Sequence, residues 1–200
     1  MNEKKQEQRR LALACRRSMT AEQRQQAGKA ICQRMLMLPE VQQAQVVMSY
    51  AAMPEEADLS SLHEWLWQQG KTVAFPVTDG HGVMHAVAAV PDSCWQTGAY
   101  GIREPMGEKI APDTIDLIIS PCVAFDDDCH RLGHGGGYYD RFLEKCPQAI
   151  CIAAAFESQH LDAVCTDGLD YTMHKVVTEC RIYERGEKNH DGSDREEADK

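Results

Sequence analysis

Apolar positions recur with a helical period over the first part of the chain. They form two stripes, made of Leu11, Leu13 and Ala14, then of Ile31, Met35 and Leu38. Between the stripes, Thr20 is followed three residues later by Gln23, the spacing of a capping box in which each residue caps the other's backbone. The pattern therefore predicts that residues 4–37 form two helices, interrupted near Met19.

Farther along, short apolar runs alternate with segments of helical pattern. The runs predict buried strands over residues 46–51, 72–77, 83–90, 115–123, 149–156 and 175–178. Helices are predicted over 60–69 and 140–145, with a helical turn at 161–164, and a hairpin turn is predicted at 79–82. Strands that alternate with helices are typical of an α/β fold. We therefore expect one three-layer α/β/α domain, Rossmann-like, with a mainly parallel sheet.

Charge is distributed unevenly over the 200 residues. Residues 1–34 contain nine lysines and arginines against three glutamates, a net charge of +6. The remaining residues carry a net charge of −16, which gives the whole chain its net charge of −10. An acidic body argues against nucleic-acid binding, which needs a broad basic surface. No apolar run approaches the roughly 18 residues of a membrane span, and the N-terminus lacks the apolar core of an export signal. We expect a cytoplasmic monomer, with a domain over 1–183 and an acidic, disordered tail over 184–200.

The nine cysteines show no Cys-x-x-Cys spacing and are expected to remain reduced, most of them in the core. Cys129, His130 and His134 allow a zinc site as an alternative, although a second clustered ligand pair is missing.

The segment Arg131–Asp140 is the strongest candidate for chemistry. It reads Arg-Leu-Gly-His-Gly-Gly-Gly-Tyr-Tyr-Asp, after a predicted strand and before a predicted helix. Glycines let backbone N–H groups approach an anion, and a run of such groups makes an anion-binding concavity. The segment lacks the Lys-Ser/Thr of a P-loop and the acidic partner of a dinucleotide fingerprint. On these residues alone it is an anion site or a flexible turn; Arg131, with Lys5 or Arg9, could neutralise a triphosphate, and Asp140 could hold Mg²⁺.

Several segments together resemble one enzyme family. Pro121–Asp126 and Arg131–Leu143 are similar to "P-x-x-A-F-D … R-L-G-x-G-G-G-Y-Y-D-R-F-L" of the 5-formyltetrahydrofolate cyclo-ligases. Further matching segments, in the same order, are the Lys5-x-x-x-Arg9 helix with Arg16, Tyr50–Asp58 with Glu56, Tyr100–Pro105 and Asp170–Glu179. The resemblance covers about residues 4–180, far more than one motif gives by chance.

The resemblance implies an ATP- and Mg²⁺-dependent cyclisation of 5-formyltetrahydrofolate to 5,10-methenyltetrahydrofolate. It assigns catalysis to Arg131 and Glu56, and Mg²⁺ binding to Asp140. It assigns ATP binding to Lys5, Arg9, Arg131, Leu132, Gly133, His134, Gly135, Gly136, Gly137, Tyr138 and Tyr139. It assigns folate binding to Ala51, Glu56, Tyr100 and Tyr138.

The chain departs from the family pattern near its end, where His174 stands at the place of a second aspartate, and the sequence leaves open whether His174 or Asp170 replaces that aspartate as a metal ligand. The runner-up function is a non-catalytic folate- or nucleotide-binding regulator on the same fold.

Overall fold

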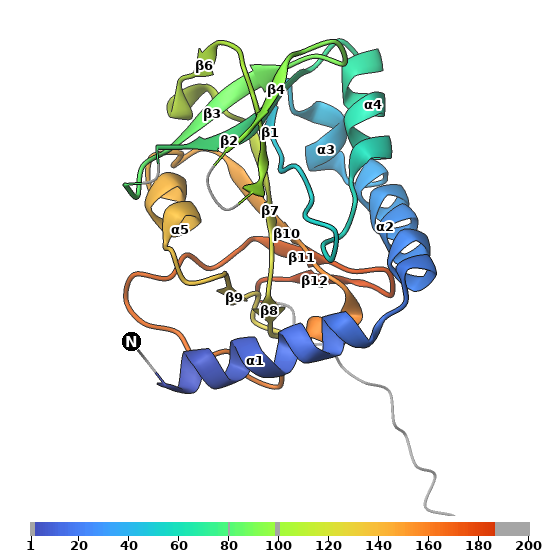
Figure 1. Ribbon diagram of the computed structural model, residues 1–200, viewed down its shortest axis with the longest axis vertical. Helices are drawn as coiled ribbons and strands as arrows, with labels where there is room; N and C mark the ends of the chain where they lie inside the picture. Colours follow the sequence, from blue (N-terminus) through green and yellow to red (C-terminus); the bar gives the residue numbers. More distant parts are fainter. Residues whose placement is uncertain (1–2, 80, 99–100, 187–200) are drawn as a thin grey trace, which may run out of the picture.

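The structure is a computed structural model that describes residues 3–79, 81–98 and 101–186 (Figure 1). Its helices are α1 (Glu3–Ser18), α2 (Ala21–Leu36), α3 (Pro39–Gln43), α4 (Ser60–Gln68) and α5 (Tyr138–Leu143), with 3₁₀ turns η2 (Pro112–Thr114) and η3 (Glu157–Gln159). Its strands are β1 (Val46–Met48), β2 (Thr72–Thr78), β3 (Met84–Ala89), β4 (Trp95–Thr97), β5 (Arg103–Pro105), β6 (Lys109–Ile110), β7 (Leu117–Pro121), β8 (Ala124–Phe125), β9 (Arg131–Leu132), β10 (Ile150–Ala154), β11 (Lys175–Val177) and β12 (Ile182–Glu184).

The main sheet has the strand order β12-β11-β10-β7-β1-β2-β3-β6. The five strands from β11 to β2 are parallel, and β12, β3 and β6 add to its edges in antiparallel fashion. The parallel strands alternate their side chains between two cores, so each face of the sheet is covered. Helices α2, α3 and α4 pack on one face and α5 on the other. The predicted three-layer α/β fold with a mainly parallel sheet is confirmed.

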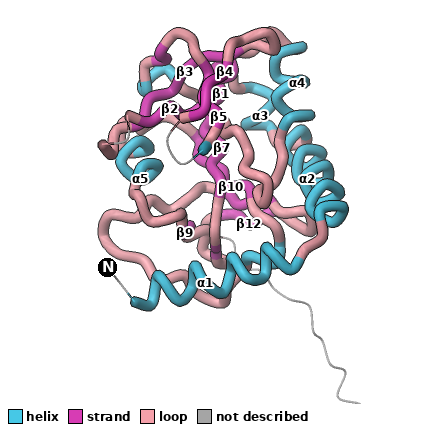
Figure 2. The backbone as a smooth tube through the Cα atoms, viewed as in Figure 1, coloured by secondary structure: helices cyan, strands magenta, loops and turns pink. Residues whose placement is uncertain are grey.

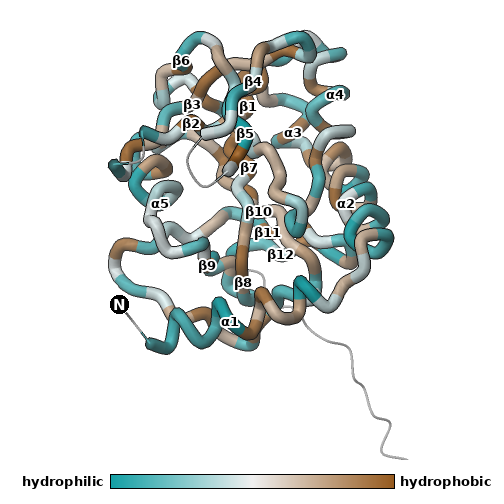
Figure 3. Tube along the Cα trace, viewed as in Figure 1, coloured by the Kyte–Doolittle hydropathy of each residue, from teal (hydrophilic) through white to brown (hydrophobic). Residues whose placement is uncertain are grey.

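Helix α1 lies apart from these layers, across the end of the molecule where β8 and β9 are found (Figures 1 and 2). The break before α2 is the predicted capping box: Gln23 N donates to Thr20 Oγ1 at 3.1 Å, and Thr20 N donates to Gln23 Oε1 at 2.7 Å. Ala12 of α1 packs with Leu132 and other residues of a small separate core. Figure 3 shows hydrophilic colour at the N-terminal end of α1 and hydrophobic colour farther along it. Ala12 therefore packs the middle of α1 against this small core, and the N-terminal part of the helix lies beside the end of β9, where Arg9 bonds to Gly133.

Several predicted boundaries were wrong. Residues 161–164 are not helical, and a 3₁₀ turn at η3 precedes them. Residues 91–112, where no strand was predicted, contain β4, β5 and β6. Strand β12 reaches Glu184, one residue into the expected tail, because it pairs with β11. Residues 187–200 lie outside the described residues, so the disordered tail stays a prediction. Within the described residues, no helix is both long and apolar enough to cross a bilayer.

Candidate active site

A cavity of about 890 Å³ opens between α1, residues 133–137 (the glycine segment), the segments that follow β1 and β7, and the C-terminal end of β2. Ligands of open α/β sheets bind beyond the carboxyl ends of the strands, where these segments lie. The predicted site residues that line it are Lys5, Arg9, Ala51, Glu56, Arg131, Leu132, Gly133, His134, Gly135, Gly136, Gly137, Tyr138, Tyr139 and Asp140. Tyr100 lies outside the described residues. The fold thus brings to one cavity the described residues to which the resemblance assigns catalysis, ATP binding or folate binding, together with Asp140.

The glycine segment connects β9 to α5. Gly135 has a φ of +100° and Gly137, the N-cap of α5, has a φ of +64°, and both values disfavour any residue with a Cβ. Because α5 spans only six residues, its dipole is small. Attraction for an anion must therefore come mainly from the N–H groups of the segment and from nearby cations.

Two arginines lie against this segment. Arg9 Nε donates to the carbonyl oxygen of Gly133 at 2.7 Å, and a Cβ on Gly135 would lie 3.3 Å from Arg9 Cζ. Arg131, whose side chain is only 3% exposed, donates from Nη2 to Asp140 Oδ1 at 2.8 Å and lies over the ring of Tyr139 at 5.4 Å. Its buried Nε has no hydrogen-bond partner within the described part of the chain. Both cations therefore lie beside the glycine segment, Arg9 bonded to Gly133 and Arg131 bonded to Asp140.

Lys5, from α1, reaches the same cavity from the other side. Its Nζ donates to Asp167 Oδ2 at 2.8 Å and to Asp170 Oδ2. Burial by itself lowers the pKa of Lys5, but the hydrogen bonds to the two carboxylates outweigh it and the pKa is raised. Asp170 therefore lines the cavity as the partner of a lysine. His174 does not line it; its Nδ1 instead accepts from the backbone N–H of Cys151 at 2.9 Å.

Glu56 is buried on the opposite wall. Its Oε2 accepts from the backbone N–H of Met53 at 3.0 Å, and its Oε1 lies 3.4 Å from His134 Nε2. Arg16 Nη1, on a side chain that is 3% exposed, lies 3.9 Å from the same Oε1. His134 thus connects the glycine segment to Glu56. The positive charge of Arg16 partly neutralises the Glu56 carboxylate.

Sequence reasoning missed two residues of this neighbourhood. Arg16 was noted only as part of a matching helix, and nothing in its position marked it as the neighbour of Glu56. Glu104 lines the cavity from β5 and is 4% exposed. Glu104 belongs to the Tyr100–Pro105 segment that matches the family, but nothing in the sequence marked it as a buried side chain.

The structure does not support the zinc alternative. Cys129 is buried, which raises the pKa of its thiol to about 12, and His130 Nδ1 lies 3.0 Å from Asp126 Oδ2. Across residues 3–79, 81–98 and 101–186 there is no group of three or more histidine, cysteine, aspartate or glutamate side chains able to hold a metal. A magnesium ion that shares its ligands with a nucleotide needs only one or two carboxylates, so Asp140 at the end of the glycine segment fits that role.

Comparison with known proteins identifies the family. The model of the 5-formyltetrahydrofolate cyclo-ligase family matches residues 1–179. The chain belongs to this family. A 5-formyltetrahydrofolate cyclo-ligase of Escherichia coli (strain K12) is 31% identical over 176 residues, which cover 84% of this chain and 97% of the relative. That of Haemophilus influenzae is 30% identical over 185 residues, which cover 88% and 99%.

Solved structures agree with these cyclo-ligase relatives. The NMR structure of Aquifex aeolicus 5,10-methenyltetrahydrofolate synthetase superposes with a TM-score of 0.81 at 28% identity and covers 94% of this chain and 98% of that chain. A Mycoplasma pneumoniae 5,10-methenyltetrahydrofolate synthetase shares the fold with a TM-score of 0.72 at 21% identity. The family and the enzyme class predicted from the sequence are confirmed.

Proposed function

We propose that the protein converts 5-formyltetrahydrofolate and ATP into 5,10-methenyltetrahydrofolate, ADP and phosphate, with Mg²⁺ as cofactor. The observation that carries the proposal is the convergence on one cavity of the described residues assigned to catalysis, ATP and folate, with cations and glycines on one wall and a buried glutamate on another. Family membership supports the same reaction.

The chemistry begins when the formyl oxygen on N5 attacks the γ-phosphorus of ATP, and ADP leaves. The formyl carbon then carries phosphate as a leaving group. N10 attacks this carbon and loses its proton, and phosphate departs with the former formyl oxygen. Phosphoryl transfer depends mainly on positioning and on charge neutralisation, with little covalent help from the protein.

The glycine segment and its arginines supply that neutralisation. Backbone N–H groups from Leu132 to Tyr139 would face the phosphates, and Arg9 and Arg131 would add positive charge at the cavity wall. In the structure Arg131 and Asp140 neutralise one another, so MgATP offers each a new partner: phosphate for Arg131 and the metal for Asp140. Asp140 would hold the Mg²⁺ ion, which would supply further neutralisation of the phosphate charge. Lys5, which pairs with Asp167 and Asp170 in the structure, would likewise pair with a phosphate when ATP binds.

Folate occupies the wall that carries Glu56. The Glu56 carboxylate accepts from Met53 N–H and lies near Arg16, and it would hold N10 or a ring N–H near the reacting carbon. Ala51 and Tyr138 line the space beside it. Tyr100 stays a predicted folate contact. We further propose that the enzyme is a cytoplasmic monomer whose partners are its two substrates, without nucleic acid or membrane.

The test is to mix the purified protein with 5-formyltetrahydrofolate and MgATP and to record the absorbance of the methenyl product. We expect product that requires ATP and disappears when the metal is chelated. Glu56→Gln should lower turnover, whereas Glu64→Gln, an exposed glutamate on α4, should leave it unchanged. Binding of both ligands without any product would favour the non-catalytic regulator instead.

A further inference from the structure

The wall opposite the glycine segment contains a carboxylate that the proposed reaction does not use. Glu104 on β5 is 4% exposed, and its Oε1 accepts two hydrogen bonds from Thr78, from the backbone N at 2.9 Å and from Oγ1 at 3.1 Å. Within the described chain, Oε2 has no hydrogen-bond partner, and Glu104 forms no ion pair with a basic side chain. Buried carboxylates are normally paired or fully hydrogen bonded.

The local backbone is shaped to keep this carboxylate in place. A Cβ added to Gly98 would lie 2.1 Å from Glu104 Cδ, so only glycine leaves room for the carboxylate there. The two Thr78 donors come from the last residue of β2, a strand within the main sheet. The position of Oε1 is therefore fixed by the sheet, and Oε2 is left as an acceptor at the cavity wall.

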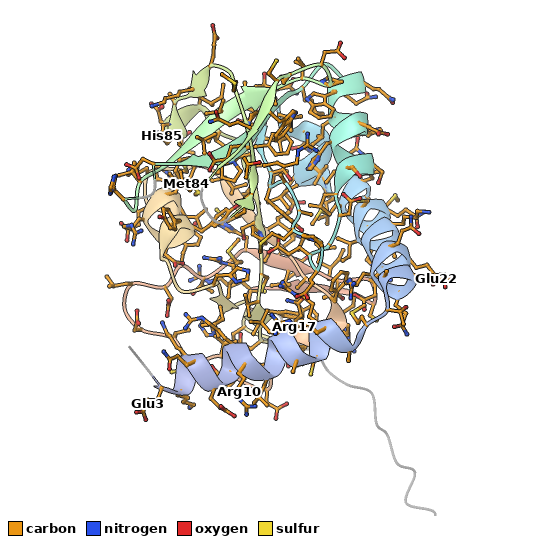
Figure 4. The ribbon with its side chains drawn as sticks, viewed as in Figure 1. Glu3, Arg10, Arg17, Glu22, Met84 and His85 are labelled. Atoms are coloured by element: carbon orange, nitrogen blue, oxygen red, sulfur yellow. The ribbon has the colours of Figure 1, made fainter. Side chains whose placement is uncertain are left out.

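Pro76, Met84 and Ile102 line the cavity near this acceptor. Met84 lies at the start of β3, on the side of the strand near α5 (Figure 4). Apolar side chains of this kind suit the faces of a flat heterocycle, whereas a carboxylate suits donors on its edge. A carboxylate offers about four lone-pair sites, and Thr78 uses two of them, which leaves room for two adjacent N–H donors.

The reduced pterin ring of the proposed substrate carries such a pair, N3–H and the 2-amino group. Glu56 is less suited to them, because its Oε2 accepts from Met53 and its Oε1 is faced by His134 and Arg16. We propose that Glu104 is the specificity-determining acceptor for the 2-amino-pyrimidinone edge of the pterin, which leaves Glu56 to the N10 side. This inference rests on the proposed function.

The experiment compares 5-formyltetrahydrofolate with its 2-desamino-2-methyl analogue on the full-length enzyme. The variant is Glu104→Gln, whose amide oxygen still accepts from Thr78 but whose NH₂ group would face the donors of the pterin. Glu108→Gln is the matched control, because Glu108 is an exposed glutamate between β5 and β6. The KM values for both folates and for ATP are measured by methenyl formation, and the dissociation constants of both folates are measured at equilibrium.

The wild type should bind the analogue about 10- to 100-fold more weakly than the parent, because a hydrogen bond to a charged group is lost. Glu104→Gln should bind the parent more weakly by a similar factor and lose the discrimination, with the KM for ATP unchanged. Glu108→Gln should behave as the wild type. If Glu104 served only to hold the structure together, Glu104→Gln would also change the KM for ATP, and the variant would still bind the parent folate more tightly than the analogue.

Equal binding of the two folates by the wild type would overturn the inference even if the variant failed to fold. Discrimination that persists in folded Glu104→Gln would overturn it too. Failure of the proposed function is a separate result, because it appears as the absence of methenyl product from the wild type, whereas the equilibrium binding comparison does not depend on turnover.

Discussion

Replacing Arg131 with methionine tests how the glycine segment handles phosphate. Methionine keeps an apolar stem of similar length but removes the guanidinium, which is 2.8 Å from Asp140 and 5.4 Å from the ring of Tyr139. The change therefore removes one charge from the cavity wall without emptying the space around it.

The magnitude follows from the contacts of the guanidinium. A charge-assisted contact to phosphate contributes about 1.5–3 kcal/mol, so kcat/KM for ATP should fall about 10- to 150-fold. Breaking a fully buried ion pair costs about 3–5 kcal/mol, but here the loss should be smaller, about 1–3 kcal/mol of unfolding free energy. The reason is that the Asp140 side chain is 22% exposed and can be hydrated, and that the variant also removes the unpartnered Nε of Arg131.

Steady-state formation of the methenyl product at varied ATP, together with urea unfolding, separates the two effects. Arg10→Met is the matched control, because Arg10 pairs with Glu7 on the exposed side of α1 and does not line the cavity. A folded Arg131→Met variant with wild-type kcat/KM for ATP would refute the placement of Arg131 at the phosphates.

Gly135→Ala should raise the KM for ATP and leave the KM for folate unchanged in steady-state kinetics. The reason is that φ of Gly135 is +100° and a Cβ there would lie 3.3 Å from Arg9 Cζ. Burial lowers the pKa of His63 from 6.5 to about 4, so the folded state binds fewer protons and the unfolding free energy should fall by about 3 kcal/mol between pH 6.5 and 4. Urea titrations should show this slope in the wild type and not in His63→Gln. The hydrogen bond from Lys5 lowers the pKa of Asp167, so its stabilisation is present above the ordinary carboxyl pKa and lost as the pH falls below it. The stability deficit of Lys5→Met should thus shrink in acid, and a deficit independent of pH would contradict an ionic contribution.

The sequence alone determined the features that depend on near neighbours in the chain. The Thr20–Gln23 capping box, the helix predicted over residues 60–69 and the buried strands of the sheet all arise from spacings of a few residues, and the structure has them. Strands β8, β9 and β12 were missed because each is only two or three residues long and is stabilised by its partner strand.

Which side chains meet was decided by the tertiary structure. Lys5 pairs with Asp170 across 165 positions, and Glu56 meets His134 across 78, separations that carry no local pattern. The motif resemblance identified Arg131 and Asp140 as site residues, yet only the fold shows that they pair with one another. Glu104 illustrates the physical reason. Nothing in the local sequence distinguishes this glutamate from an exposed one, and it becomes a buried acceptor at the cavity wall because the fold brings Thr78 and Gly98 against it.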